Sequence, residues 1–413
     1  MPDSKDTHVS RMGHPAPFVT PPSAPPIYQT TAFDVPDLYV LEQLCDGRVN
    51  GHTYTRDSNP NHSALADSLA AMEGAEAGAV FSSGMGAIAA IIISMVNSGD
   101  HLLMSGSLYG QTLQLMGRLQ QQFNVDVTQT RITDPDRVAR DVRPETKLCL
   151  AETISNPMLE VADIAELSSV LGDVPLIVDN TFTTPELIRP LEHGAHAVVH
   201  SASKYLNGHG DVMLGVSAGT QQLMSSAIET ASLFGQNANP FESWLTQRGL
   251  RTLSVRMKQI CETTRRLATF LREQNGIRRV RYPMFEDHAS HQAAMRLYPQ
   301  GAGGIITIDL DTDGVAGVSR FMRAIPELPF SPTLADARTT VSHPASTSNR
   351  FMTDAERSAA GITPQTIRIS VGLEGLEQLQ DDFARGLAAA CSDAAVTEPS
   401  TGVTSHATTR RKH

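Results

Sequence analysis

The sequence is poor in cysteine and has no long hydrophobic run. The longest apolar stretch, residues 87–96, contains Ser94 and is too short to span a membrane. The first six residues lack the charged and then apolar pattern of a secretory signal, so we predict a cytoplasmic protein. No Cys-x-x-Cys pair occurs, which favours reduced thiols over a disulfide framework. The four cysteines lie far apart, at Cys45, Cys149, Cys261 and Cys391.

Positive charge and aromatic residues are also scarce. The 33 Lys and Arg residues are outnumbered by 44 Asp and Glu residues, and the net charge of −11 argues against a nucleic-acid partner. Aromatic residues make up 5% of the chain, and we expect its single tryptophan, Trp244, to be a core or interface anchor. The 40% hydrophobic content is typical of an α/β protein, and 413 residues suffice for two or three domains.

One lysine has an unusual setting. Lys204 follows a short apolar strand predicted at residues 197–199, where burial lowers the pKa of an amine and makes it a nucleophile. Ser201 and Ser203 alternate before it, so both hydroxyls can face one phosphate. Upstream, Asp179 ends another apolar strand, where an aspartate can hold a protonated pyridinium nitrogen. A Schiff-base lysine with such an acid is typical of pyridoxal phosphate (PLP), which we predict as the cofactor.

A second pattern indicates where the phosphate would bind. Residues 77–81 form a predicted strand, and after Ser83 a helix is predicted from Gly84 to Val96. At a helix N-terminus, bare backbone N–H groups and the helix dipole attract an anion. The Gly-Met-Gly sequence is a weak signal by itself. It gains weight because Lys204 and Asp179 occur in the same chain.

Short apolar strands alternate with helices, which predicts an α/β fold with a large, mostly parallel sheet. Ligand sites in such sheets lie at the carboxyl ends of the strands. Five candidate residues follow predicted strands in this way: Gly84, Tyr109, Asn156, Asp179 and Lys204.

The chain divides into four predicted parts. These are an N-terminal arm (1–58), a large cofactor-binding domain (59–245), a smaller C-terminal α/β domain (246–391) and a disordered tail (392–413). One long helix is predicted over residues 241–274 and would carry the chain out of the large domain.

Together these motifs resemble the Cys/Met-metabolism family of PLP-dependent enzymes, which includes cystathionine γ-synthase, cystathionine γ-lyase and methionine γ-lyase. The resemblance covers about residues 27–387 and implies fold type I of the PLP-dependent transferases, which is aspartate aminotransferase-like. The matching segments are Tyr54-Thr55-Arg56-x-x-Asn59-Pro60, Ser83-Gly84-Met85, Leu108-Tyr109-Gly110, Asp179-Asn180-Thr181, His200 to Leu206 and Arg368 to Glu374.

The resemblance also implies a role for each matching residue. Lys204 holds the cofactor and moves protons, and Tyr109 stacks on the cofactor ring and assists catalysis. Arg368 grips the substrate carboxylate as a bidentate fork. Tyr54 and Arg56 reach the phosphate of a neighbouring subunit, so the implied active unit is a homodimer or homotetramer with shared active sites. The other implied cofactor-binding residues are Gly84, Met85, Asn156, Asp179, Ser201 and Ser203.

The sequence departs from the family where the substrate side chain would lie. Gln111 stands where methionine γ-lyases usually have cysteine and cystathionine enzymes glycine. The family's Ser-Leu-Gly becomes Thr333-Leu334-Ala335, and Arg338 replaces an acid of the cystathionine enzymes. Asn349 replaces the histidine of a Met-Thr-His segment. We therefore predict that an unusual amino-acid substrate contacts Gln111, Thr333, Leu334, Arg338 and Asn349. The alternative for Arg338 is that it points to solvent.

The predicted reaction is γ-elimination, in which an L-amino acid loses a leaving group from Cγ and is released as a keto acid. γ-Replacement by a nucleophile and β-elimination of a carbon–sulfur bond need the same lysine and ring partner, so both stay open. A PLP-binding scaffold without turnover is the non-enzyme alternative, and the presence of Lys204 speaks against it. We predict no metal, and we interpret three closely spaced histidines as packing and turn residues: His193, His196 and His200.

Overall fold

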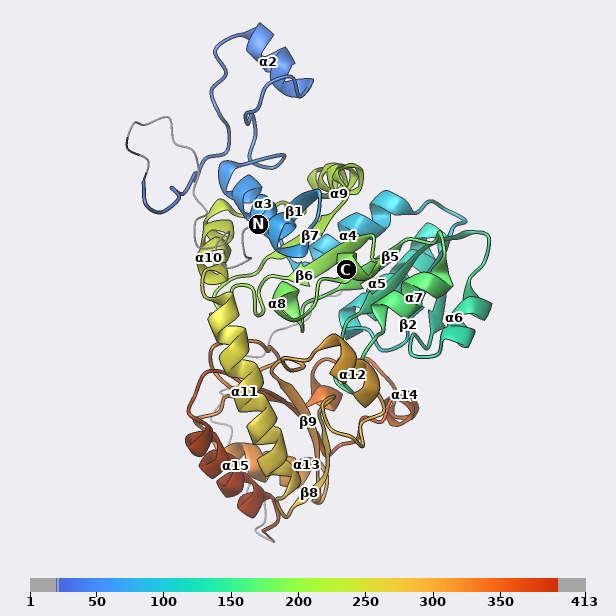
Figure 1. Ribbon diagram of the computed structural model, residues 1–413, viewed down its shortest axis with the longest axis vertical. Helices are drawn as coiled ribbons and strands as arrows, with labels where there is room; N and C mark the ends of the chain where they lie inside the picture. Colours follow the sequence, from blue (N-terminus) through green and yellow to red (C-terminus); the bar gives the residue numbers. More distant parts are fainter. Residues whose placement is uncertain (1–19, 21, 393–413) are drawn as a thin grey trace, which may run out of the picture.

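The computed structural model describes residue 20 and residues 22–392. A seven-stranded sheet and a four-stranded sheet form the centres of two halves of the molecule, and α11 (Leu253–Arg272) runs from one half into the other (Figure 1). Most of the predicted arm (1–58) and the first residue of the predicted tail, Ser392, are described. The rest of the predicted tail, 393–413, lies outside the described residues.

The large sheet is mostly parallel, which confirms the predicted α/β fold. Its strand order is β1-β7-β6-β5-β4-β2-β3, and β7 alone runs antiparallel to its neighbours β1 and β6. The strands are β1 (Ala77–Phe81), β2 (His101–Ser105), β3 (Asp126–Thr130), β4 (Thr146–Glu152), β5 (Leu176–Asp179), β6 (Ala197–Ser201) and β7 (Gly215–Gly219).

Helices bury both faces of this sheet. Along β5, Ile177 packs into a cluster that contains residues of α4 and α9, whereas Leu176 and Val178 face the cluster under α6 and α7. Apolar side chains are therefore needed at successive strand positions, as expected for a parallel sheet. The helices of this half are α3 (Pro60–Glu73), α4 (Gly84–Met95), α5 (Gly110–Phe123), α6 (Pro135–Asp141), α7 (Ile164–Leu171), α8 (Thr184–Leu187), α9 (Gln221–Phe234) and α10 (Pro240–Leu250).

The smaller sheet is antiparallel, with the order β10-β11-β9-β8. The phenyl rings of Phe321 and Phe383 pack together, 6.0 Å between centroids, and join α13 to α15 beside this sheet. The elements are β8 (Ile277–Arg281), α12 (His291–Leu297), β9 (Ile305–Leu310), α13 (Val315–Ala324), β10 (Thr340–Ser342), α14 (Asp354–Ala359), β11 (Thr366–Ser370) and α15 (Leu376–Ala390).

The single helix expected over residues 241–274 is wrong, because the chain breaks between α10 and α11. The carbonyl of Gly249 accepts hydrogen bonds from the backbone N–H of Thr252 (3.1 Å) and from Nη2 of Arg256 (3.0 Å). A carbonyl occupied in this way does not continue the i to i+4 pattern into the next turn. The residues at the break are Gly249, Leu250, Arg251 and Thr252, and the glycine was its one local sign.

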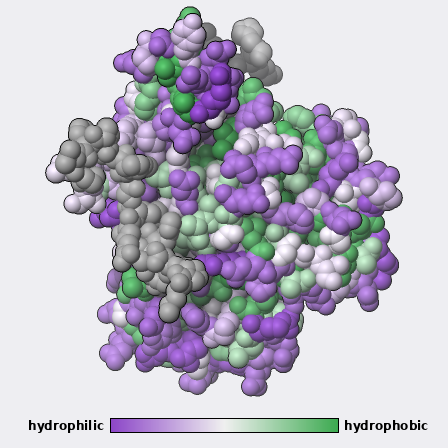
Figure 2. All heavy atoms as spheres, turned by 45° about the horizontal axis from the view of Figure 1, so that its top comes forward, coloured by the Kyte–Doolittle hydropathy of each residue, from purple (hydrophilic) through white to green (hydrophobic). Residues whose placement is uncertain are grey.

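The N-terminal segment leaves the body of the molecule. The short helix α2 (Leu38–Cys45) is capped by the Asp37 side chain and buries none of its residues; Leu38 is 80% exposed. The segment projects from the rest of the chain (Figure 1), and hydrophobic surface is visible on it among polar residues (Figure 2). Its contact with a neighbouring subunit stays a prediction. Among the described residues, no helix is long and apolar enough to cross a membrane.

Candidate active site

Lys204 lies in the turn that follows β6. Its backbone N–H donates to the Ser201 carbonyl (3.0 Å), and its Nζ donates to Oγ1 of Thr333 (3.1 Å). Burial, and then the charge of Arg368, lower the pKa of the Lys204 amine to about 8. Desolvation disfavours the charged form, so a share of the amine is neutral just above pH 7. The residue can therefore act as a nucleophile or a base.

Two carboxyl side chains, buried Glu152 and half-buried Asp179, end adjacent strands. Asp179 of β5 pairs with Glu152 of β4 in the sheet register, and its Oδ1 accepts hydrogen bonds from the Thr181 backbone N–H (3.0 Å) and hydroxyl (2.5 Å). Burial raises the pKa of Asp179 above its ordinary value despite these hydrogen bonds. Burial, and then the charge of Asp179, raise the pKa of Glu152. An acid held at the end of β5 fits the predicted partner of a ring nitrogen.

Glu152 is a site residue that the sequence analysis missed. Its Oε1 accepts the backbone N–H of Tyr109 at 2.6 Å, which fixes the start of α5 next to Asp179. Tyr109 is 37% exposed. The only signal was position, because Glu152 ends β4 just as Asp179 ends β5.

The start of α4 forms a cradle with room only for glycine. A Cβ on Gly84 would lie 2.8 Å from Cβ of Ser201, and one on Gly215 would lie 2.0 Å from the Ser83 carbonyl oxygen. The Ser83 hydroxyl accepts the Gly86 N–H (3.0 Å), and the N–H groups of Gly84 and Met85 have no acceptor within the helix. Close backbone packing and bare N–H groups fit a phosphate. Gly215 was not predicted.

Ser203, another predicted phosphate ligand, already makes a hydrogen bond within the chain. The Ser203 hydroxyl accepts the Leu214 backbone N–H at 3.0 Å. Its assignment to the phosphate, like that of Ser201, stays a prediction.

Arg368 is buried in β11 and points at the same site. Nη1 donates to Oδ1 of Asn156 and Nη2 to the Thr333 carbonyl, both at 3.0 Å. Its Nε has no hydrogen-bond partner among the described residues, and burial lowers the pKa of the guanidinium to about 10. A buried donor without an acceptor suits a carboxylate ligand. The structure thus brings Lys204, Thr333, Arg368 and Asn156 together.

The predicted substrate residues occupy different settings. Gln111 and Arg338 are exposed, whereas the Leu334 side chain is part of the hydrophobic core. Asn349 is buried in a segment that approaches α5 closely: a Cβ on Gly110 would lie 2.3 Å from the Ser348 carbonyl. Ala335, where the family has glycine, has a φ of +64°, the left-handed region that favours glycine. Substrate contacts of these residues stay predictions.

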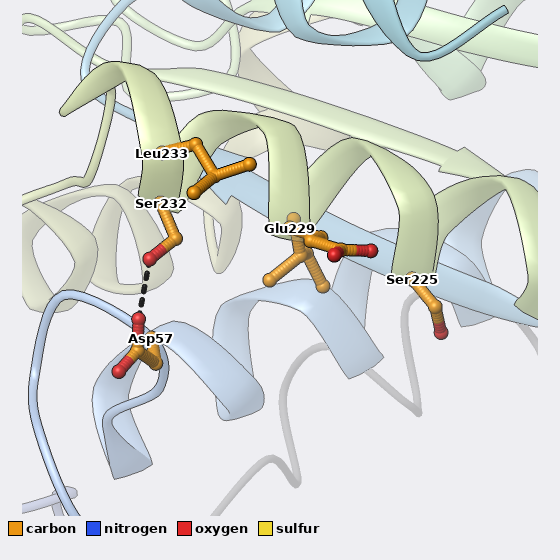
Figure 3. A pocket seen from close by; sticks show the side chains of 6 residues that line it. Asp57, Ser225, Glu229, Ser232 and Leu233 are labelled. Carbon is orange, nitrogen blue, oxygen red and sulfur yellow. Dashed lines mark hydrogen bonds between the residues drawn. The ribbon is translucent and has the colours of Figure 1, made fainter.

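Tyr54 and Arg56 lie beside α9. The Arg56 guanidinium carbon stands 4.9 Å from the centre of the Tyr54 ring, and Nε donates to the Ser232 hydroxyl at 3.3 Å. A pocket of about 330 Å³ opens next to them (Figure 3). Its lining is Asp57, Ser225, Ile228, Glu229, Ser232 and Leu233. The predicted reach of Tyr54 and Arg56 to a neighbouring subunit's phosphate is not tested by these contacts.

In the part of the chain that the structure describes, no group of three or more His, Cys, Asp or Glu side chains could hold a metal ion. His193, His196 and His200 therefore form no metal centre there. The Nδ1 of His196 accepts the Leu176 backbone N–H (3.1 Å), which is a packing role. His200 is fully buried and bonds to Glu73 at 2.7 Å.

The cradle gives a direct prediction. Gly84→Ala places a methyl group against Ser201 and should weaken PLP binding about 10- to 100-fold, a loss of ~1.4–3 kcal/mol, while the protein stays folded. The dissociation constant can be measured by titrating the apo-protein and following cofactor absorbance. Gly117→Ala in α5 is the control, because its Cβ would meet no atom within 4 Å. Unchanged binding in Gly84→Ala would refute the assignment of the cradle.

Comparisons with known proteins agree with this site. The family model described as Cys/Met metabolism PLP-dependent enzyme matches residues 6–388. An O-succinylhomoserine sulfhydrylase of Pseudomonas aeruginosa is 38% identical over 345 residues, which are 83% of this chain and 85% of that protein. An L-methionine γ-lyase of Porphyromonas gingivalis is 35% identical over 369 residues, 88% of this chain and 92% of that protein.

A solved structure shows the same architecture. Cystathionine γ-synthase from Xanthomonas oryzae pv. oryzae, in complex with aminoacrylate and cysteine, superposes with a TM-score of 0.88 at 31% identity, over 94% of this chain and 99% of that one. Since the family model covers nearly the whole chain and the lysine, acid and anion cradle fit the cofactor, this protein belongs to the family of PLP-dependent enzymes of Cys/Met metabolism.

Proposed function

We propose that this enzyme removes a γ-leaving group from an L-amino acid by elimination. The supporting observation is the placement of the Lys204 amine, which bonds to the side chain of Thr333 while the Thr333 carbonyl bonds to Arg368. A substrate whose carboxylate binds Arg368 would present its Cα beside that amine. A base within reach of the proton it removes is the first requirement of general base catalysis.

Each residue has one task in this proposal. When bound, PLP supplies an electron sink for the substrate. Arg368 binds and orients the carboxylate, and Asp179 holds a proton on the ring nitrogen. Lys204, with a pKa of about 8, takes the Cα proton and then a Cβ proton, and the leaving group departs from Cγ with the bonding electrons. An amino acid with γ-substituent X and water then give a 2-oxo acid, ammonium and X–H.

γ-Replacement is the second candidate, favoured by the similarity to an O-succinylhomoserine sulfhydrylase. In that reaction sulfide or a thiol takes the place of X at Cγ, and the same residues serve. The exposed cation of Arg338 would suit the distal carboxylate of a succinyl leaving group.

Proton NMR in D2O separates these reactions. The holoenzyme is incubated with L-methionine, O-acetyl-L-homoserine and O-succinyl-L-homoserine, each with and without sulfide. Deuterium at Cα and Cβ of the recovered amino acid, with release of a 2-oxo acid, supports elimination. A sulfur-substituted product formed only with sulfide supports replacement. Deuterium at Cα alone for every substrate would refute both and favour β-elimination. No exchange at all would favour the scaffold without turnover.

A further inference from the structure

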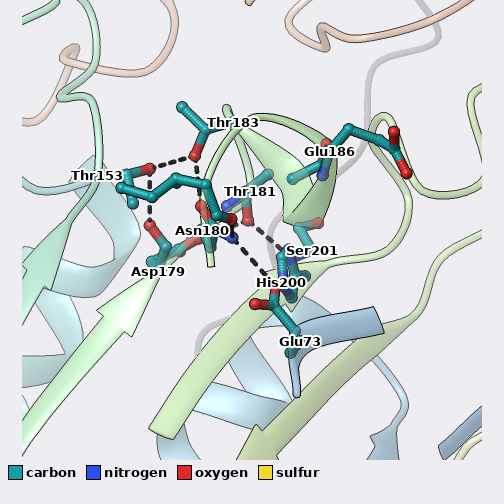
Figure 4. Close-up of polar contacts among 11 residues, drawn as sticks. Glu73, Thr153, Asp179, Asn180, Thr181, Thr183, Glu186, His200 and Ser201 are labelled. Atoms are coloured by element: carbon teal, nitrogen blue, oxygen red, sulfur yellow. Dashed lines mark hydrogen bonds and ion pairs between the residues drawn. The ribbon is translucent and has the colours of Figure 1, made fainter. Parts of the chain in front are cut away.

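A fully buried polar cluster lies behind Asp179. Oε1 of Glu73, at the end of α3, accepts hydrogen bonds from Nε2 of His200 (2.7 Å) and from Nδ2 of Asn180 (3.0 Å). Glu73, His200 and Asn180 are each 0% exposed. They come from three different elements and meet at one point (Figure 4). The proposed reaction uses none of them.

This cluster is attached to the acid on both sides. Asn180 directly follows Asp179, and its backbone N–H donates to the Val199 carbonyl on β6 (2.9 Å). The next residue, Thr181, donates its hydroxyl to Asp179 (2.5 Å), and that hydroxyl accepts the Ser201 backbone N–H (2.8 Å). A movement of His200 or Glu73 would therefore shift the backbone that aims the Asp179 carboxyl.

The cluster is not built for stability alone. Oε2 of Glu73 and Nδ1 of His200 are buried without a hydrogen-bond partner among the described residues. Buried polar atoms that stay unpaired are destabilising, and well-packed apolar residues in place of a buried ion pair are often at least as stable. The presence of Glu73 and His200 next to the site therefore suits an electrostatic role better than a packing role.

Opposing effects act on the pKa of Asp179. Burial raises the pKa of Asp179, and the Thr181 hydrogen bonds and then the charge of His200 lower it. Two titratable groups act on the pKa of Asp179: Glu152, its register partner on β4, and His200, which follows its register partner Val199 on β6. Of the two, only His200 can carry a positive charge, which it does when its imidazole is protonated. Without it, Asp179 would share its surroundings with Glu152 and no opposing charge.

We propose that Glu73 and His200 are positioning residues that aim the Asp179 carboxyl and keep it ionised, so that Asp179 can hold a proton on the ring nitrogen of the cofactor. Glu73 orients the imidazole through Nε2 and anchors Asn180. His200 supplies the compensating positive charge. The proposal rests on the cofactor site and not on γ-elimination, so it holds for any reaction that this site performs.

The test reads the ring nitrogen directly. Wild type and variants are reconstituted with ¹⁵N-labelled pyridoxal phosphate, and the nitrogen chemical shift is followed against pH. His200→Gln should lower the proton affinity of the ring nitrogen about tenfold or more, one unit in the midpoint. Glu73→Gln should lower it in the same direction. Far-UV circular dichroism reports whether each protein is folded.

The control is another buried histidine of the same sheet. His101 on β2 is 1% exposed and bonds to Thr146 (2.7 Å) and Thr128 (2.9 Å), so His101→Gln removes a buried imidazole without touching the cluster. Its nitrogen titration should match wild type. Wild-type titration in folded His200→Gln and Glu73→Gln would overturn the proposal. If a single variant does not fold, the double replacement Glu73→Leu with His200→Leu leaves no unpaired charge and takes the same measurement.

Discussion

Replacement of Lys204 by methionine should abolish turnover and stabilise the apo-protein. Loss of the base and cofactor anchor should lower kcat about 10³-fold or more. Stability should change because the pKa of Lys204 falls from 10.5 to about 8 in the fold. Below pH 8 the folded protein holds the charged Lys204 amine in a buried place, whereas the unfolded chain keeps it in water. At ~1.4 kcal/mol per pKa unit, this lowers the stability of the wild-type fold by about 3 kcal/mol. The variant also loses the hydrogen bond to Thr333, which reduces its gain in stability by about 1 kcal/mol.

The sign of the pH dependence makes this prediction specific. The variant should gain about 2 kcal/mol over wild type at pH 7. The gain should shrink as the pH rises from 8 towards 10.5, because the wild-type amine loses its charge there. Urea unfolding of both apo-proteins at several pH values measures this difference. Lys258→Met, at an exposed position of α11, should change neither activity nor stability. A gain that does not depend on pH would contradict the buried charge.

Replacement of Arg368 by lysine should lower kcat/KM by about 10²- to 10³-fold, mainly through KM. A lysine cannot bind Asn156 and Thr333 as the guanidinium does while a third donor remains for the substrate. Loss of one partner in a buried, charge-assisted contact typically removes about 2–5 kcal/mol. Steady-state kinetics with the substrate found by NMR give the two constants separately.

A second arginine, half-buried in the smaller sheet, provides the comparison. Arg281 pairs with Asp309 at 2.7 Å, so Arg281→Lys alters a largely buried ion pair away from the site. Its KM should equal that of wild type even if the protein is less stable. If Arg368→Lys lowered kcat and left KM unchanged, Arg368 would not be the ground-state carboxylate ligand.

Local sequence patterns predicted the strand ends well and the contacts between distant segments poorly. Asp179 and Lys204 could be found because each follows an apolar run, and a buried parallel strand requires such a run. Two contacts of the site join segments more than a hundred residues apart: Gly215 packs against Ser83, and Lys204 donates a hydrogen bond to Thr333. The spacing of residues within one segment cannot predict such contacts. Glu73 was hidden for the same reason, since its partners lie on other elements.

The strand order also has a consequence for synthesis of the chain. β1, which leads into the cradle at Gly84, is completed by β7, where Ala77 pairs with Gly219. Arg368, the proposed carboxylate ligand, lies still later in the chain, in β11. A nascent chain on the ribosome would thus expose an unpaired β1 edge until β7 has been translated. Pairing across such a sequence separation is slow to form. The cradle at Gly84 is therefore completed only after β7 has been translated, and a cofactor bound there would stabilise the later steps of folding.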